Sequence, residues 1–313
     1  MDGVNPLQQQ RISVLVVGGT GESGPDDRRS GVSGMLAHVT DNLDERFDAV
    51  WVGYPASYGP APSWQGMAYE DSVAIGCENL AAAFAATGGR VMMLGYSQGA
   101  VVVRRFVARL ARTEPAAVRR IVGVGLVADP HQPSGVVEGC HGSGVAGPDD
   151  ASVSGADAVP AYWVGAADDV ICNASADSLI RDIADLTGNL GVNGTAALGS
   201  WVTSMWATLR RNGFQNAART AVSPAQWRRD GRRLVVAARE VAGYLPTVIS
   251  WRGIRFDNDR GGRHTSYGVE PYRRHSLTDR DATGCEILAR WLQVQATFVE
   301  YVVPVDDSAR AAA

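Results

Sequence analysis

The chain of 313 residues contains no lysine, only five histidines and only four cysteines. All 29 of its basic side chains are therefore arginines, and its formal net charge is −4. Binding to nucleic acid relies on a basic surface that neutralises phosphates, so this balance argues against a nucleic-acid partner. The four cysteines lie far apart and lack the spacing of a metal site. Nothing in the composition therefore calls for a metal ion.

Long apolar runs are also missing. No stretch reaches the roughly 18 to 20 apolar residues that a membrane span needs, and the first residues lack the features of a secretory signal. We therefore expect synthesis in the cytoplasm without a signal peptide or a stable membrane span. Hydrophobic residues make up 45% of the chain and charged residues 20%, which is typical of a folded globular protein rather than a disordered one.

Short β-branched runs alternate with helical patterns along most of the sequence. The runs at 12–17, 49–52, 91–94, 121–127 and 161–164 are predicted strands. Apolar residues at helical spacing predict helices over about 73–84, 103–110 and 285–299. This alternation predicts an α/β fold in three layers, with a mostly parallel sheet between helices. Cys77 and Cys285 fall on apolar faces of these helices, which predicts core thiols.

Two segments interrupt the alternation. Residues 135–158 are rich in glycine and serine and are predicted to form a long surface loop. Residues 176–260 show helical periods without intervening strands, and Ser223-Pro224 is a good start for the last of these helices. We therefore expect a catalytic domain over 10–175 and 261–305, with a helical insertion over 176–260 that serves as a linker or lid.

The pentapeptide Gly95-Tyr96-Ser97-Gln98-Gly99 joins a predicted strand to a predicted helix. The pattern G-x-S-x-G is weak by itself, but this context is the one that exposes a nucleophilic serine at the end of a sheet. The following helix begins with partial positive charge, where an oxyanion would form. Ser97 is therefore the candidate nucleophile.

A serine nucleophile needs a histidine base and an acid that orients it. In α/β-hydrolases these follow in the order serine, acid, histidine, which leaves His264 and His275. His264 is favoured because it lies in a glycine-rich loop, whereas His275 belongs to an arginine cluster. Asp168 and Asp169 both follow a predicted strand end and are alternative acids. Asp129 is a third candidate, for which a structural role is favoured.

The oxyanion hole of such enzymes combines the backbone N–H after the nucleophile with one from a loop after an earlier strand. These positions correspond to Gln98 and to the loop Gly18-Gly19-Thr20-Gly21-Glu22. The loop lacks both G-x-G-x-x-G and G-K-[ST], so a nucleotide site is not expected.

Together these segments resemble the cutinase-like serine esterases of the α/β-hydrolase superfamily, and among them the phage lysin B mycolylarabinogalactan esterases. The resemblance is carried by the serine motif, by Asp169-Val170-Ile171-Cys172, by His264-Thr265-Ser266-Tyr267 and by Gly19-Thr20-Gly21-Glu22. It implies a triad of Ser97, Asp169 and His264, with Thr20 and Gln98 as the oxyanion residues. It also selects Asp169 over Asp168 as the acid.

The resemblance implies a lipid or glycolipid ester of the cell envelope as substrate, namely the ester that joins mycolic acids to arabinogalactan. It implies no cofactor, no metal and no obligatory protein partner, and it implies release to the envelope when a phage lyses its host. Two features depart from cutinases. Gly165 stands where cutinases have a cysteine, and a long insertion separates the acid from the histidine. The insertion favours the lysin B branch, while a general cutinase or lipase is the alternative; whether Cys140 and Cys172 pair is left open.

Overall fold

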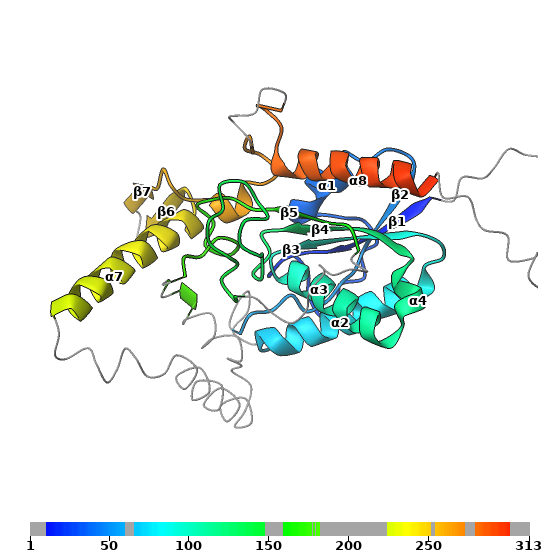
Figure 1. Ribbon diagram of the computed structural model, residues 1–313, viewed down its shortest axis with the longest axis horizontal. Helices are drawn as coiled ribbons and strands as arrows, with labels where there is room; N and C mark the ends of the chain where they lie inside the picture. Colours follow the sequence, from blue (N-terminus) through cyan, green and yellow to red (C-terminus); the bar gives the residue numbers. More distant parts are fainter. Residues whose placement is uncertain are drawn as a thin grey trace, which may run out of the picture.

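A computed structural model describes residues 11–59, 66–147, 159–176, 178, 180–181, 224–251, 254–272 and 279–300. Its centre is a sheet of five strands in the order β2-β1-β3-β4-β5, in which every neighbouring pair is parallel (Figure 1). The strands are β1 (Ile12–Val17), β2 (Phe47–Trp51), β3 (Val91–Tyr96), β4 (Ile121–Val127) and β5 (Ala161–Val164). All five predicted strands are therefore present, with β2 starting and β3 ending two residues beyond the predicted limits.

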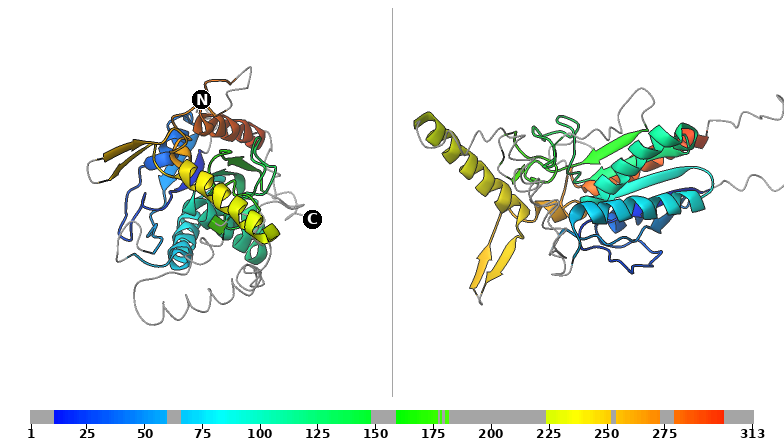
Figure 2. Two further views of the ribbon diagram at one scale, coloured as in Figure 1. Left: turned by 90° about the vertical axis from the view of Figure 1, so that its left-hand side faces the viewer. Right: turned by 90° about the horizontal axis from the view of Figure 1, so that it is seen from below.

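Helices cover both faces of the sheet (Figures 1 and 2). One face carries α2 (Tyr69–Ala86) and α3 (Gln98–Thr113), and a short α4 (Pro115–Val118) follows α3. The other carries α8 (Gly284–Glu300) with η1 (Gly34–Leu36) and α1 (Ala37–Thr40). This three-layer arrangement, with a serine turn between β3 and α3, is the α/β-hydrolase type of fold and confirms the predicted class.

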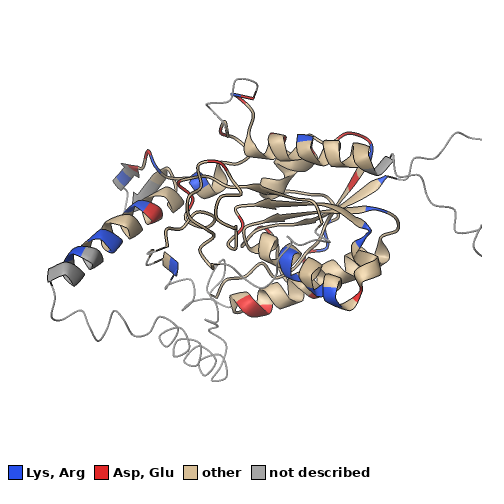
Figure 3. Ribbon diagram, in the orientation of Figure 1, with Lys and Arg blue, Asp and Glu red and all other residues tan. Residues whose placement is uncertain are grey.

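The strands can lie between two helical layers because they are apolar on both sides. The strands β1, β3, β4 and β5 contain no charged residue (Figure 3), as expected for a parallel sheet that is buried on both faces. Along β1, Leu15 and Val17 pack toward α2 and α3, whereas Val14 and Val16 pack toward α8. Cys77 and Cys285 are buried in these two layers, so the prediction of core thiols is confirmed.

The described part of the predicted insertion contains one long helix and a hairpin. The helix α7 (Pro224–Tyr244) begins at the expected proline. The strands β6 (Val248–Trp251) and β7 (Ile254–Asp257) pair antiparallel, so the expectation of helices alone was wrong. The rest of the expected helical insertion before α7 lies outside the described residues, except for residues 176, 178 and 180–181. The domain limits stay a prediction. No helix in the described ranges is long and apolar enough to cross a membrane.

The predicted surface loop at 135–158 is partly buried over its described part, 135–147. Val137, Cys140 and Val145 are buried. Ser143 pairs with Ala174, and the Val145 N–H donates to the Ile171 carbonyl at 2.9 Å. This part is a loop, as predicted, but its scattered apolar residues bury some of it against the segment that follows β5.

Candidate active site

Ser97 occupies a strained turn between β3 and α3. Its φ is 53° and its ψ is −116°, a conformation that costs a non-glycine residue roughly 1–3 kcal/mol. The flanking glycines allow the turn because a Cβ on Gly95 would lie 2.6 Å from the Ala100 Cα. A Cβ on Gly99 would lie 2.2 Å from the Val17 carbonyl oxygen. The close packing of α3 on the sheet therefore fixes the serine at the carboxyl edge of β3.

The structure brings together the three residues of the predicted triad. His264 lies in η2 (Arg263–Thr265), and its Nε2 is 3.0 Å from the Ser97 Oγ. Its Nδ1 is 2.9 Å from the Asp169 Oδ2. These contacts join residues from three distant parts of the chain in one continuous line. The geometry allows His264 to accept the Ser97 proton while Asp169 holds the imidazole.

The Asp169 carboxylate is fully buried but well supplied with donors. The Tyr267 O–H donates to its Oδ2 at 2.6 Å, and the Ile171 N–H donates to its Oδ1 at 3.0 Å. Burial alone would raise the pKa of Asp169, but the neighbouring His264 and these hydrogen bonds outweigh it and leave the pKa below its ordinary value. Asp169 is therefore ionised at neutral pH, as an acid that orients a histidine must be.

The competing acids lie elsewhere. Asp168 is exposed to solvent. Asp129 is buried in a separate network, where it pairs with the Arg104 guanidinium at 3.2 Å and accepts the Trp163 indole N–H at 3.0 Å. Asp129 thus has the structural role that its sequence context favours. The alternative base, His275, lies outside the described residues.

Two tyrosine rings pack against the imidazole. The Tyr96 ring stacks on His264 with centroids 5.2 Å apart, and its O–H donates to the His264 carbonyl at 2.8 Å. The Tyr244 ring, at the end of α7, lies 5.4 Å from the imidazole. Together they hold the imidazole by its ring and backbone, so His264 is positioned by both the sheet and α7.

The two predicted oxyanion residues lie side by side. The Gln98 side chain is buried, and its Oε1 accepts the Tyr54 O–H at 3.2 Å and the Thr20 O–H at 3.4 Å. Its Nε2 donates to the Ser57 carbonyl at 2.9 Å. These hydrogen bonds fix the Gln98 side chain in the interior, where it has a structural role. The backbone N–H of Gln98 is different: because Gln98 is the first residue of α3, this N–H has no carbonyl partner within the helix. That N–H is the group that can face an oxyanion.

The loop that carries Thr20 is anchored by Glu22. The Glu22 carboxylate accepts the Gly19 N–H and the Met35 N–H, each at 2.8 Å. Gly21 donates its N–H to the Ala56 carbonyl at 2.9 Å. The loop is therefore held both within itself and to the segments that follow β2 and precede α1.

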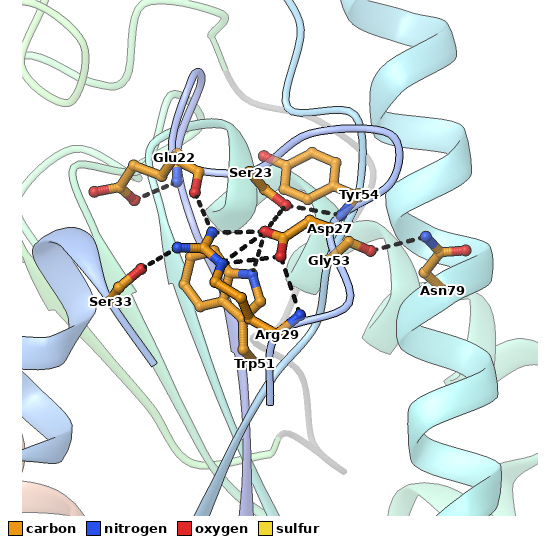
Figure 4. A network of polar contacts seen from close by, with 10 residues as sticks. Glu22, Ser23, Asp27, Arg29, Ser33, Trp51, Gly53, Tyr54 and Asn79 are labelled. Carbon is orange, nitrogen blue, oxygen red and sulfur yellow. Dashed lines mark hydrogen bonds and ion pairs between the residues drawn. The ribbon is translucent and has the colours of Figure 1, made fainter. Parts of the chain in front are cut away.

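A second network secures the far end of this loop (Figure 4). At its centre the Asp27 carboxylate accepts the Arg29 guanidinium, the Trp51 indole N–H at 3.0 Å and the Ser23 O–H at 2.8 Å. The hydrogen bond from Arg29 is the main reason that the pKa of Asp27 lies well below its usual range. Arg29 also donates to the Glu22 carbonyl at 2.7 Å. The loop beside Ser97 is thus rigidly supported.

Cys140 and Cys172 are both buried free thiols in the structure. The Cys172 Sγ lies 3.5 Å from the Tyr267 hydroxyl oxygen. Burial raises the pKa of Cys172, while the neighbouring Cys172 thiol lowers the pKa of Cys140. Within the described ranges, no group of three or more histidine, cysteine or acidic side chains is arranged to hold a metal ion.

Three residues that support the site, Tyr96, Tyr244 and Glu22, were not predicted from the sequence. Tyr96 and Glu22 stand inside the motifs already identified, beside Ser97 and Thr20, so their positions carried a signal. Nothing in the sequence pointed to Tyr244, because its contact with His264 depends on where the end of α7 lies in space.

Comparison with known proteins finds one family model and several solved structures that are similar to parts of this chain. Residues 46–156, which include Ser97 but neither Asp169 nor His264, match a family model described as the PE-PPE domain. No curated protein matches the chain. A cutinase-like protein from Cryptococcus sp. aligns at 19% identity and a TM-score of 0.35, over 64% of this chain and 94% of that one. A pyrethroid hydrolase from Sphingobium faniae JZ-2 aligns at 17% identity and a TM-score of 0.25, over 42% and 45%. The chain is thus similar to the PE-PPE domain across its serine-bearing segment.

Proposed function

We propose that the chain is a serine esterase that hydrolyses carboxylic esters. The observation that carries this proposal is the line from Ser97 Oγ through the His264 imidazole to Asp169, with contacts of 3.0 and 2.9 Å. The strained backbone of Ser97 supports it, because strain of this kind is retained where a side chain must be presented for function.

In the first step, His264 Nε2 removes the Ser97 proton as Oγ attacks the ester carbonyl carbon. Asp169 remains ionised and stabilises the imidazolium that forms. The negative charge that develops on the carbonyl oxygen is stabilised by the Gln98 N–H at the start of α3 and by Thr20 in the adjacent loop. His264 then gives its proton to the alcohol as the carbon–oxygen bond breaks, which leaves an acyl group on Ser97.

In the second step, water replaces the alcohol. His264 removes a proton from the water as its oxygen attacks the acyl carbon, and then returns the proton to Ser97 as the acid departs. The same donors stabilise the second oxyanion.

The proposed substrate is the ester that joins mycolic acids to arabinogalactan, cleaved after a phage enzyme reaches the envelope at lysis. This finer proposal rests on the sequence motifs that resemble lysin B and on the long segment between Asp169 and His264. The broader alternative is a cutinase or lipase with a wider range of lipid esters, which would use the same triad.

The test compares wild type, Ser97→Ala and Ser134→Ala on p-nitrophenyl esters of graded chain length and on purified mycolylarabinogalactan. Ser134 is an exposed serine far from the triad in sequence and serves as the matched control. We expect Ser97→Ala to lower kcat by at least about a thousandfold, and Ser134→Ala to leave it unchanged.

Release of mycolate that depends on Ser97 would support the finer proposal. Activity that depends on Ser97 but is limited to simple esters would replace it with the general esterase. Hydrolysis that survives in Ser97→Ala, or a wild type inactive on every ester, would refute the proposed function.

A further inference from the structure

Exposed apolar side chains gather on one short part of the described chain. Of eleven large hydrophobic residues that are exposed in the described ranges, six fall between residues 234 and 248. These are Leu234, Val235, Val241, Tyr244, Leu245 and Val248. Leu234, in the middle of α7, is 63% exposed. Single exposed apolar residues are ordinary, but a cluster of this kind marks an interaction surface.

Most of this cluster shares one side of α7 and its end. Leu234, Ala238, Val241 and Leu245 recur at intervals of four, three and four residues, which brings them onto one stripe of a helix with 3.6 residues per turn. Val235 widens the stripe on one side. The stripe runs for about 16 Å along the helix, at 1.5 Å per residue. We call these five residues the apolar arc.

Arginines border the apolar arc on the side of Val235. Arg228, Arg232 and Arg239 recur at intervals of four and seven residues and are all exposed. The helix as a whole has five arginines against two carboxylates, in a chain whose net charge is −4 (Figure 3). Positive charge is therefore concentrated on α7, which an anionic partner would complement.

The helix that carries the arc ends beside the catalytic triad. The helix extends beyond the edge of the sheet with its Tyr244 end nearest the body (Figures 1 and 2). Tyr244 packs against the His264 imidazole with ring centroids 5.4 Å apart. The end of α7 that is next to Leu245 of the arc therefore contacts the triad through Tyr244.

We propose that the apolar arc and its arginines dock on the surface of an anionic lipid assembly. The aliphatic side chains would enter the boundary between headgroups and acyl chains, and the arginines would extend to the charged headgroups. This combination of an aliphatic stripe and a basic border is typical of helices that lie on membranes. The inference goes beyond the proposed esterase activity, although its purpose, bringing lipid esters to Ser97, rests on that function.

The experiment measures sedimentation of the full chain with vesicles of phosphatidylcholine alone or with an equal part of phosphatidylglycerol. The Ser97→Ala protein is used throughout, so binding is measured without hydrolysis. We expect binding to the anionic vesicles that weakens as salt is raised. The double variant Leu234→Gln/Val241→Gln should weaken binding at least about tenfold. The control is Val294→Gln/Phe298→Gln, which alters two exposed residues on α8.

A second pair of variants tests the charge. Substituting Arg228, Arg232 and Arg239 by glutamine should weaken binding to anionic vesicles by about fivefold for each arginine. The exposed Arg112→Gln and Arg119→Gln serve as controls outside α7. In an otherwise wild-type background, the arc and arginine variants should hydrolyse a soluble short ester at the normal rate. A failure of vesicle binding is thereby separated from a failure of the esterase.

Equal binding by the arc variants and their controls would overturn the proposal, as would a protein that does not bind anionic vesicles. If the arc is the contact between two copies of the chain, wild type will dimerise and Leu234→Gln/Val241→Gln will not, with no vesicle binding in either. If it is covered by another segment of the same chain, the double variant will unfold more readily and wild type will not bind. Either result would reject the lipid surface.

Discussion

The hydroxyl of Tyr267 is placed to position the triad acid, and Tyr267→Phe tests this. The hydroxyl donates to the Asp169 Oδ2 at 2.6 Å and accepts the Ala166 N–H at 3.1 Å, in a fully buried environment. Phenylalanine fills the same space without the oxygen. The substitution therefore removes one donor from a buried carboxylate and one acceptor from a backbone N–H.

The size of the effect follows from these two contacts. A hydrogen bond to a charged group contributes about 1.5–3 kcal/mol, and an unpaired buried N–H costs about 1–3 kcal/mol. We expect Tyr267→Phe to lower the free energy of unfolding by about 3 kcal/mol. If the looser Asp169 carboxylate loses about 1.4 kcal/mol of its stabilisation of the imidazolium, kcat falls about tenfold. KM should change little, because the hydroxyl is buried beneath the triad.

The assay combines urea unfolding with steady-state hydrolysis of a short p-nitrophenyl ester. Tyr272→Phe is the matched control, since its hydroxyl accepts the Gly165 N–H at 3.2 Å without contacting the triad. Because the lost hydrogen bond favours the ionised carboxyl, the pKa of Asp169 should rise in Tyr267→Phe alone. The loss of stability in acid that Asp169 causes should then be smaller and should level off at a higher pH than in wild type. A kcat that matches the Tyr272→Phe value would refute a positioning role for Tyr267.

Three further predictions concern the supports of the site. Gly99→Ala should prevent the turn from closing, because its Cβ would lie 2.2 Å from the Val17 carbonyl oxygen; circular dichroism of the purified variant should show a markedly lower melting temperature, and a wild-type value would contradict this. Asp129→Asn should cost about 3–5 kcal/mol in urea unfolding, since it breaks a buried ion pair with Arg104, and a cost below about 1 kcal/mol would show the pair to be unimportant. Asp169 has a pKa below its ordinary value of 3.8, so the stability it contributes is present above that pH and is lost as the pH falls below it. The free energy of unfolding of wild type should therefore exceed that of Asp169→Asn by less and less as the pH is lowered through this range. A difference that stays constant with pH would contradict the shifted pKa.

Much of the sheet could be predicted because its strands are continuous apolar runs, which can be recognised in the sequence without knowing which strands pair. The predicted limits of β1, β4 and β5 agree with the structure. The hairpin of β6 and β7 was missed because its strands are only four residues long and follow closely on a helical period, although Pro246 before β6 and Gly253 between the strands are breaker residues in the sequence. The segment 135–147 is a loop as predicted, but its partial burial was missed because its three buried apolar side chains are scattered among glycines and polar residues.

The site was predictable to the extent that chain order constrains it. The order of serine, acid and histidine pointed to His264, but the residues alone could not separate Asp168 from Asp169. That choice depends on the direction of each side chain in the turn after β5, where one carboxylate is buried at 0% exposure and its neighbour lies in solvent. The contact of Tyr244 with His264 could not be predicted, since it arises only when α7 has been placed.

The central claim is that Ser97 is a nucleophile activated by His264 and Asp169. The most direct test is to treat the protein with a fluorophosphonate, which phosphonylates activated serines, and to locate the adduct by peptide mass spectrometry. The account predicts one adduct, on Ser97, whose formation slows by orders of magnitude in His264→Gln and is absent in Ser97→Ala. An adduct on another serine, or labelling of Ser97 at the same rate without His264, would contradict it.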